Sequence, residues 1–221
     1  MTPYYYSDNR VTIYHADCRD VLPFLEGGLA IVSDPPYGVA LRNGDVDGHR
    51  SARSFGIVGD ETDALGRWLI SWVNGRHTLI LFASPWSPWP GDWRNLIVWD
   101  KGGAVGGGGD PGTCLKRSWE LIQVNNRWPL RTGRQESVWR CLVTPADTFQ
   151  HIAAKPVEIL SRLLQAFVLP HETIVDPFMG SGSTLVAAKS LGHRAIGIEI
   201  EERYCEIAAE RCRQEVLDLG A

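Results

Sequence analysis

The residues best suited to chemistry form the tetrapeptide Asp34-Pro35-Pro36-Tyr37, which directly follows the apolar run 29–33. That run is typical of a buried parallel strand, and open α/β sheets bind ligands where such strands end. The two prolines lack N–H donors, so carbonyl oxygens are left beside a carboxylate and an aromatic ring. The pattern predicts a pocket of hydrogen-bond acceptors with a stacking wall. Such a pocket suits a planar ligand that carries an amino group, such as adenine or cytosine.

A second candidate site is the glycine-containing turn 176–184, which joins an expected strand to an expected helix. Gly180 and Gly182 allow the chain to turn tightly and let a ligand approach the backbone. Glu199 ends the next apolar run, where an acidic residue can hold ribose hydroxyls. The combination predicts a cofactor of the adenosine type.

The elements that position these residues alternate along the chain. Helical periodicity is clearest after Lys155, and a second helix is expected over 183–192. Short β-branched runs predict strands at 11–15, 29–33, 78–82, 95–99, 173–176 and 194–198. This alternation is typical of an α/β sheet with crossover connections.

Two glycine-rich stretches, 38–60 and 102–112, interrupt the alternation. The second opens a strand-rich segment at 118–140, which we interpret as part of an insertion attached to the α/β core rather than a second domain. The whole chain, 1–221, is therefore expected to form a single domain. The segment contains three tryptophans that we predict to anchor the core: Trp119, Trp128 and Trp139.

Length and composition restrict the protein class. A chain of 221 residues, 44% of them hydrophobic, can bury a sizeable core, which excludes a disordered protein. Its apolar stretches are far shorter than the roughly 20 residues that span a bilayer. The N-terminus also lacks the basic and apolar regions of a signal peptide. We therefore expect a cytoplasmic protein.

Charge is distributed unevenly around a net value of −4. Residues 101–140 contain seven basic and three acidic residues, whereas those from Gly197 onward contain seven acidic and three basic ones. The basic middle segment is a candidate for contact with phosphate, and the acidic end suits a solvent-facing helix.

The cysteines give no sign of a metal site. Five are present without a Cys-x-x-Cys pair, and Cys205 and Cys212 share one face of an expected helix with no histidine at ligand spacing. We expect reduced thiols and no bound metal.

Taken together, the motifs at 34–37 and 176–184 resemble the S-adenosylmethionine-dependent DNA amino-methyltransferases, which methylate N6 of adenine or N4 of cytosine. The order of the two motifs is the circularly permuted order of the family's beta group. Segments 15–22, 151–156 and 197–204 also resemble family elements, in the expected order. The resemblance implies a Rossmann-like methyltransferase sheet with helices on both faces and a small inserted target-recognition segment.

The resemblance implies a catalytic role for the tetrapeptide. Asp34 and the Pro35 carbonyl would accept the two N–H bonds of the target amine, with Pro36 completing the rigid motif. Tyr37 would stack on a base that has left the duplex.

For the cofactor, the resemblance implies that Gly180 and Gly182 admit the methionine portion and that Glu199 holds the ribose. Lys155 is expected to pair with the methionine carboxylate. The other residues expected at the cofactor are Asp17 and Cys18, bordering the adenine, and Asp176, Phe178, Ser181, Ser183 and Thr184 of the turn.

The expected partner is double-stranded DNA. Residues 101–142 would recognise the target sequence, and the mobile loop 38–60 would close over the flipped base. The basic residues expected at DNA are Lys116, Arg117, Arg131 and Arg134. A homodimer and a cognate restriction enzyme are left open.

Alternatives differ in how well they explain the motifs. A cytosine-C5 methyltransferase needs a Pro-Cys pair, which is absent. N4-cytosine enzymes more often carry serine in place of Asp34, so aspartate favours N6-adenine. Protein-glutamine methyltransferases usually begin the tetrapeptide with asparagine. A catalytically silent cofactor-binding module would not need Asp34 and Tyr37, and an NAD-dependent dehydrogenase would place its glycine turn near the N-terminus.

Overall fold

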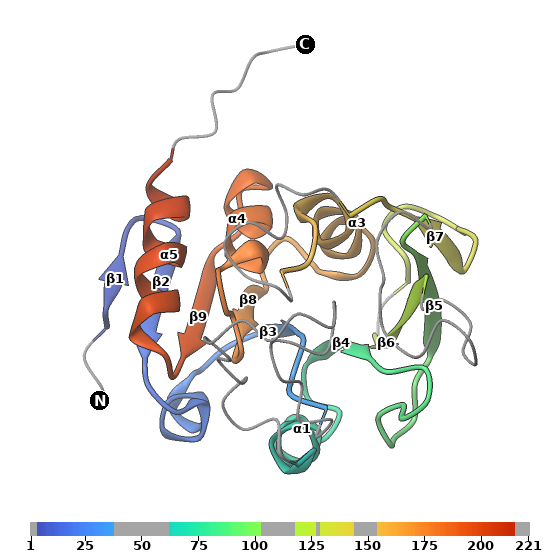
Figure 1. The fold of residues 1–221 in the computed structure, drawn as a ribbon, viewed down its shortest axis with the longest axis horizontal. Helices are drawn as coiled ribbons and strands as arrows, with labels where there is room; N and C mark the ends of the chain where they lie inside the picture. The colour runs from blue at the N-terminus through green and yellow to red at the C-terminus, as the bar shows by residue number, and fades with distance from the viewer. Residues whose placement is uncertain (1–3, 38–61, 103–117, 127–128, 144–153, 215–221) are drawn as a thin grey trace, which may run out of the picture.

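One mixed sheet organises the molecule (Figure 1). The computed structural model describes residues 4–37, 62–102, 118–126, 129–143 and 154–214. Within these residues nine strands pair in the order β1-β2-β9-β8-β3-β4-β6-β5-β7. The strands are β1 (Tyr6–Ser7), β2 (Val11–His15), β3 (Leu29–Ser33), β4 (Thr78–Ala83), β5 (Asn95–Asp100), β6 (Trp119–Asn125), β7 (Val138–Arg140), β8 (Thr173–Asp176) and β9 (Ala195–Glu199).

The middle of the sheet is parallel. β2, β9, β8, β3 and β4 all run in the same direction, so their last residues meet on one side of the molecule, which we call the carboxyl end of the sheet. The six strands that the sequence predicts are all present, with bounds shifted by one residue at most. Asp34, Asp176 and Glu199 therefore come together at the carboxyl end, as the strand pattern predicts.

The segment 101–142 differs from an appended insertion. Its β6 lies inside the sheet, antiparallel to both β4 and β5, and its β7 extends the sheet beyond β5. The reason is the apolar character of β6, whose Ile122 and Val124 are fully buried. Since β6 is reversed, it begins at the carboxyl end, where β5 and β7 finish.

Helices cover both faces of the sheet, which confirms the Rossmann-like architecture. One face carries α3 (Val157–Phe167), α4 (Ser183–Ser190) and α5 (Glu202–Arg213). The other carries α1 (Ala64–Val73) and the short 3₁₀ helices η1 (Cys18–Asp20) and η2 (Leu22–Phe24).

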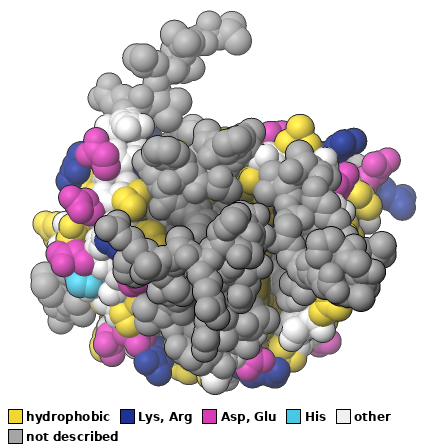
Figure 2. Space-filling model, in the orientation of Figure 1, with side chains coloured by type: hydrophobic (Ala, Val, Ile, Leu, Met, Phe, Trp, Pro, Cys, Tyr) yellow, Lys and Arg dark blue, Asp and Glu magenta, His cyan; other side chains and the backbone are white. Residues whose placement is uncertain are grey.

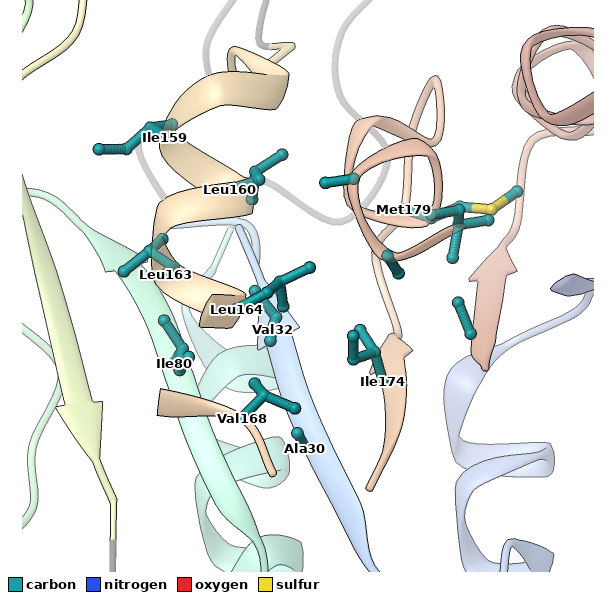
Figure 3. Close-up of a cluster of buried hydrophobic side chains, with 14 of the residues drawn as sticks. Ala30, Val32, Ile80, Ile159, Leu160, Leu163, Leu164, Val168, Ile174 and Met179 are labelled. Carbon is teal, nitrogen blue, oxygen red and sulfur yellow. The ribbon is translucent and has the colours of Figure 1, made fainter. Parts of the chain in front are cut away.

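The packing of α3 shows how the apolar face expected after Lys155 is used (Figure 3). Leu160, Leu163 and Leu164 are at most 1% exposed, and they lie over β3, β4 and β8. Burying each such side chain contributes roughly 1.5–3 kcal/mol. Because α3 starts at the carboxyl end, this packing fixes the position of Lys155, two residues before the helix.

The acidic C-terminal pattern forms the exposed face of α5. Glu202, Glu206 and Glu210 are exposed at helical spacing, and Figure 2 shows acidic side chains along the rim on that side. Cys205 and Cys212 lie on the opposite, buried face as free thiols. Trp139 is buried and Trp119 is half-exposed, whereas Trp128 lies outside the described residues.

No described helix combines the length and the apolarity needed to cross a membrane. Among the same residues, no group of three or more His, Cys, Asp or Glu side chains is arranged to hold a metal ion.

Candidate active site

Asp34 is held between two donors at the carboxyl end of the sheet. One carboxylate oxygen accepts the Tyr37 hydroxyl, and the other accepts the Lys155 ammonium. The Asp34 side chain remains 21% exposed. Burial raises the pKa of Asp34, and the positive charge of Lys155 opposes that rise. The result is an oriented acceptor with a partly open face.

The rest of the tetrapeptide forms one wall of this site. Pro35 is buried, while Pro36 and Tyr37 are partly exposed. The Tyr37 ring lies 5.9 Å from the ring of Trp89, at an interplanar angle of 40°. The aromatic ring expected for stacking is therefore braced by a second aromatic residue that packs against the core.

Asp176 lies beside the end of β3. Its carboxylate accepts hydrogen bonds from the Ser33 hydroxyl at 2.5 Å and from the Phe178 amide at 3.2 Å. Burial raises the pKa of Asp176 to about 6. Asp176 thus links the ends of β3 and β8 and fixes the start of the glycine turn.

The glycine turn requires backbone conformations that suit glycine. Gly180 and Gly182 have φ angles of 49° and 80°, in the region that residues with a Cβ avoid. A Cβ at Gly182 would also lie 2.7 Å from the Cβ of Ala208 in α5. The turn therefore packs directly against α5.

The serines of the turn are braced from α5. Arg211 donates to the Ser181 carbonyl at 2.8 Å and to the hydroxyls of Ser181 and Ser183 at 3.1 Å each. Ser181, Ser183 and Thr184 are buried, whereas Phe178 is partly exposed. Arg211 is a positioning contact that the spacing of the motif does not indicate.

Glu199 faces the glycine turn from the end of β9. One of its carboxylate oxygens accepts the Gly180 amide at 3.0 Å, and the other accepts the amides of Ile200 and Glu201 at 2.8 and 2.9 Å. Burial raises the pKa of Glu199, and these amides oppose the rise. Glu199 is therefore in direct hydrogen-bonding contact with the glycine turn.

Asp17 and Cys18 lie beside Glu199. The amide of Ala16 donates to the Glu199 carbonyl at 2.9 Å, which places the next two residues at the same end of the sheet. Asp17 caps η1 and pairs with Arg19 at 2.6 Å. Burial raises the pKa of the Cys18 thiol to about 12, so this group stays neutral near pH 7.

Lys155 is placed beside the carboxylate of Asp34. Its ammonium contacts Asp34 and lies 3.5 Å from a carboxylate oxygen of Glu120 and 5.1 Å from the centre of the Phe82 ring. The two carboxylates raise the pKa of Lys155, so it is cationic. In this structure the predicted partner of the methionine carboxylate is paired with protein carboxylates instead.

Sequence comparison identifies the family. A sequence profile described as "DNA methylase", of the N6/N4 type, matches residues 88–210, which is more than half of the chain. The chain belongs to the N6/N4 DNA methylase family. It is a DNA methyltransferase, and DNA is its substrate.

Individual proteins agree with this assignment. YubD of Escherichia coli (strain K12), named as a methylase, is 46% identical to this methylase over 209 residues, which cover 88% of this chain and 87% of YubD.

Two solved structures share the fold of this methylase. The complex of M1.HpyAVI with S-adenosylmethionine has a TM-score of 0.66 at 20% identity and covers 92% of this chain and 100% of its own. The PvuII cytosine-N4-specific DNA methyltransferase has a TM-score of 0.67 at 13% identity, with coverages of 96% and 89%.

Of the basic residues expected at DNA, the two that the structure describes, Arg131 and Arg134, do not lie at the carboxyl end. Arg131 donates to the Val168 carbonyl at 3.0 Å, beyond the last residue of α3, and Arg134 lies three residues further along the same connection. This connection joins the end of β6 to the start of β7, at the amino end of the sheet, away from Asp34. Lys116 and Arg117, the loop 38–60 and much of 101–142 lie outside the described residues.

The structure adds residues to the site of this methylase that the motifs do not indicate. Glu120 and Lys101 pair at 2.8 Å beside Lys155. Trp86 and Trp119, 65% and 37% exposed, stack at 6.3 Å near the ends of β4 and β6. The sequence offers one indication of Glu120, because this charged residue interrupts the apolar alternation of β6.

Proposed function

We propose that this methylase transfers a methyl group from S-adenosylmethionine to the exocyclic N6 amine of adenine within a short site on duplex DNA. The observation that carries the proposal is the Asp34 carboxylate, held at the carboxyl end of the sheet by Tyr37 and Lys155. In the family pattern, aspartate at this position is the adenine-directed form.

The residues at the glycine turn fit S-adenosylmethionine. A carboxylate at the end of β9 can accept ribose hydroxyls, and the turn before α4 carries glycines where the cofactor would approach the backbone. Gly180, Gly182 and Glu199 would hold it, with Asp17 and Cys18 bordering the adenine. When bound, the cofactor supplies a methyl group from a sulfonium centre, with the bonding electron pair returning to sulfur.

The catalytic task of the protein is to make a weak nucleophile reactive. The lone pair of an exocyclic amine is delocalised into the base ring, and positive charge grows on nitrogen as the new carbon–nitrogen bond forms. Asp34 and the Pro35 carbonyl would accept the two N–H bonds and favour a pyramidal, more cationic nitrogen. This interaction strengthens in the transition state, which is where it accelerates the reaction. The nitrogen then releases one proton to solvent.

N4-cytosine is the second candidate product. The acceptor pocket contacts features that adenine and cytosine share, and the PvuII enzyme, whose fold is similar, is named as cytosine-N4-specific. That likeness concerns the fold, whereas the aspartate at position 34 concerns the site. We therefore favour adenine.

Analysis of the methylated nucleosides tests the proposal. Genomic DNA without methylation is incubated with the protein and S-adenosylmethionine, digested, and separated by mass spectrometry. We expect N6-methyladenine. N4-methylcytosine without N6-methyladenine would overturn the choice of base. If S-adenosylmethionine binds and no methylated nucleoside forms, the protein is a silent cofactor-binding module.

A charge-removing variant tests the cofactor assignment. Glu199→Gln replaces one acceptor oxygen by a donor that faces backbone amides, and it removes charge-assisted hydrogen bonds to ribose hydroxyls. The affinity for S-adenosylmethionine should fall roughly 10- to 100-fold in calorimetry. Glu206→Gln makes the same change on the exposed face of α5 and should bind normally. Equal affinities in both variants would remove Glu199 from the cofactor site.

Target recognition is assigned to residues 101–142, with Lys116 and Arg117 as the candidate phosphate contacts. Arg131 and Arg134 are less well placed, because their connection lies at the amino end of the sheet. The loop 38–60 remains the proposed cover for the flipped base. A DNA substrate also favours the cytoplasmic location that the sequence predicts.

A further inference from the structure

A line of alternating charges leads from Asp34 into β6. The Lys155 ammonium contacts Asp34 on one side and lies 3.5 Å from Glu120 on the other, and the Lys101 ammonium lies 2.8 Å from the second oxygen of Glu120. Between 12% and 24% of each of these four side chains is exposed. The four groups form the charge chain Asp34–Lys155–Glu120–Lys101.

The register of β6 explains why Glu120 reaches this position. Glu120, Ile122 and Val124 alternate along β6, so their side chains point to the same face of the sheet. Ile122 and Val124 are buried on this face, which α3 covers. Glu120 therefore extends a row of core side chains toward Lys155, just before α3. A carboxylate at the end of an apolar row loses hydration, which requires a compensating partner.

The partners of Glu120 are limited. Its oxygen facing Lys155 is buried, and among the described residues it accepts no hydrogen bond, so the 3.5 Å ion pair is its closest compensation. The positive charge of Lys155 is thus shared by two carboxylates. Because Glu120 also attracts the Lys155 ammonium, the pairing of Lys155 with Asp34 is weaker. The Asp34 oxygens are then better able to accept hydrogen bonds from the target amine.

We propose that Glu120 is a positioning residue for methyl transfer, which acts through Lys155 to keep the acceptor oxygens of Asp34 aimed at the target amine. The proposal rests on the proposed function. The charge chain is neutral as a whole, so it does not oppose the positive charge that grows on the amine. Without Glu120 its net charge would be +1, which would oppose that charge.

The variant Glu120→Gln tests this role. Turnover at saturating DNA and cofactor should fall about 10- to 100-fold, by analogy with metal sites, where removing a group that orients a ligand has an effect of this size. The binding constant for S-adenosylmethionine should change little. Glu206→Gln, which changes an exposed carboxylate on α5 far from the charge chain in sequence, is the matched control and should keep normal turnover.

The pH dependence separates this role from a structural one. The described titratable groups that face Asp34 are Lys155, Tyr37, Glu120 and Asp176. Removing the anion at 120 should lower the pKa of Asp34, so the acidic limb of the turnover profile should move to lower pH. Lys101→Gln removes a cation from the same chain, and it should move the limb to higher pH. Opposite shifts from two neighbouring substitutions are not expected from general loosening.

A readout without catalysis completes the test. The carboxyl carbon of Asp34, labelled with ¹³C and assigned by its absence in Asp34→Asn, can be titrated by NMR in the full chain. Its pKa should be lower in Glu120→Gln than in the unmodified protein. If the protein methylates neither base, the proposed function fails, and this titration still decides whether Glu120 acts on Asp34.

Several results would overturn the inference. Shifts in the same direction for both variants would do so, as would unchanged turnover in a folded Glu120→Gln protein. A higher KM for DNA with an unmoved acidic limb would make Glu120 a DNA contact instead. Thermal unfolding of each variant ensures that the comparison is made between folded proteins.

Discussion

Asp34→Asn should lower turnover by roughly 10²- to 10³-fold, the loss that follows removal of one preorganised electrostatic contact to the transition state. The structure gives the reason. Both oxygens of Asp34 accept from donors, the Tyr37 hydroxyl and the Lys155 ammonium. Asparagine has one acceptor oxygen and one N–H₂ donor. Its N–H₂ group would therefore face another donor, which is the Tyr37 hydroxyl, the Lys155 ammonium or the target amine. Single-turnover methyl transfer at saturating cofactor measures the effect.

Two comparisons make this result specific. Cofactor affinity, measured by calorimetry, should change much less than turnover, because Asp34 directly follows β3 and is not part of the glycine turn. Asp63→Asn removes a carboxylate that pairs with Arg67 on the exposed surface of α1, and it should retain normal turnover. Equal losses of affinity and turnover in Asp34→Asn would assign this residue to cofactor binding.

Gly182→Ala should lower the free energy of unfolding by about 2 to 5 kcal/mol and weaken cofactor binding. Two costs add. A left-handed backbone costs a residue with a Cβ about 1–2 kcal/mol. The new methyl group would meet the Ala208 Cβ at 2.7 Å and its Cα at 3.2 Å, and such overpacking costs about 1–3 kcal/mol. Denaturant unfolding measures the total.

Gly192→Ala separates the two costs. Gly192 has a φ of 77°, close to that of Gly182, and a Cβ there would have no neighbour within 4 Å. This variant should therefore lose only the backbone contribution, about 1–2 kcal/mol, and bind the cofactor normally. Equal losses in the two variants would show that the contact between the turn and α5 relaxes without cost.

Much of the fold can be predicted because local patterns agree with it. The strand at 29–33 is apolar up to Ser33 and is buried throughout, and the face of α3 read from Leu160, Leu163 and Leu164 is the face that packs on the sheet. The meeting of Asp34, Asp176 and Glu199 follows from parallel strands alone, because their carboxyl ends share one side of a sheet.

Other features depend on pairings that the sequence pattern does not specify. Strand propensity identifies 118–124 but carries no direction, so the antiparallel placement of β6 between β4 and β5 could not be read from it. The partner of Lys155 depends on that placement, since Glu120 reaches it only because β6 is reversed. Arg131 contributes to the basic charge of its segment, yet its guanidinium donates to the Val168 carbonyl at the end of α3.

The hairpin formed by β5 and β6 has a consequence for how specificity can change over time. The Lys101 amide donates to the Ser118 carbonyl at 2.8 Å, and Asp100 is in register with Trp119, so the two strands are tied together at the carboxyl end. Lys101 and Glu120 are set by this ladder and not by the residues between them. Insertions, deletions or recombination between Gly102 and Ser118 can therefore exchange one sequence for another while the charges behind Asp34 stay in place. With target recognition proposed for residues 101–142, such changes would alter the DNA target without rebuilding the chemistry at Asp34.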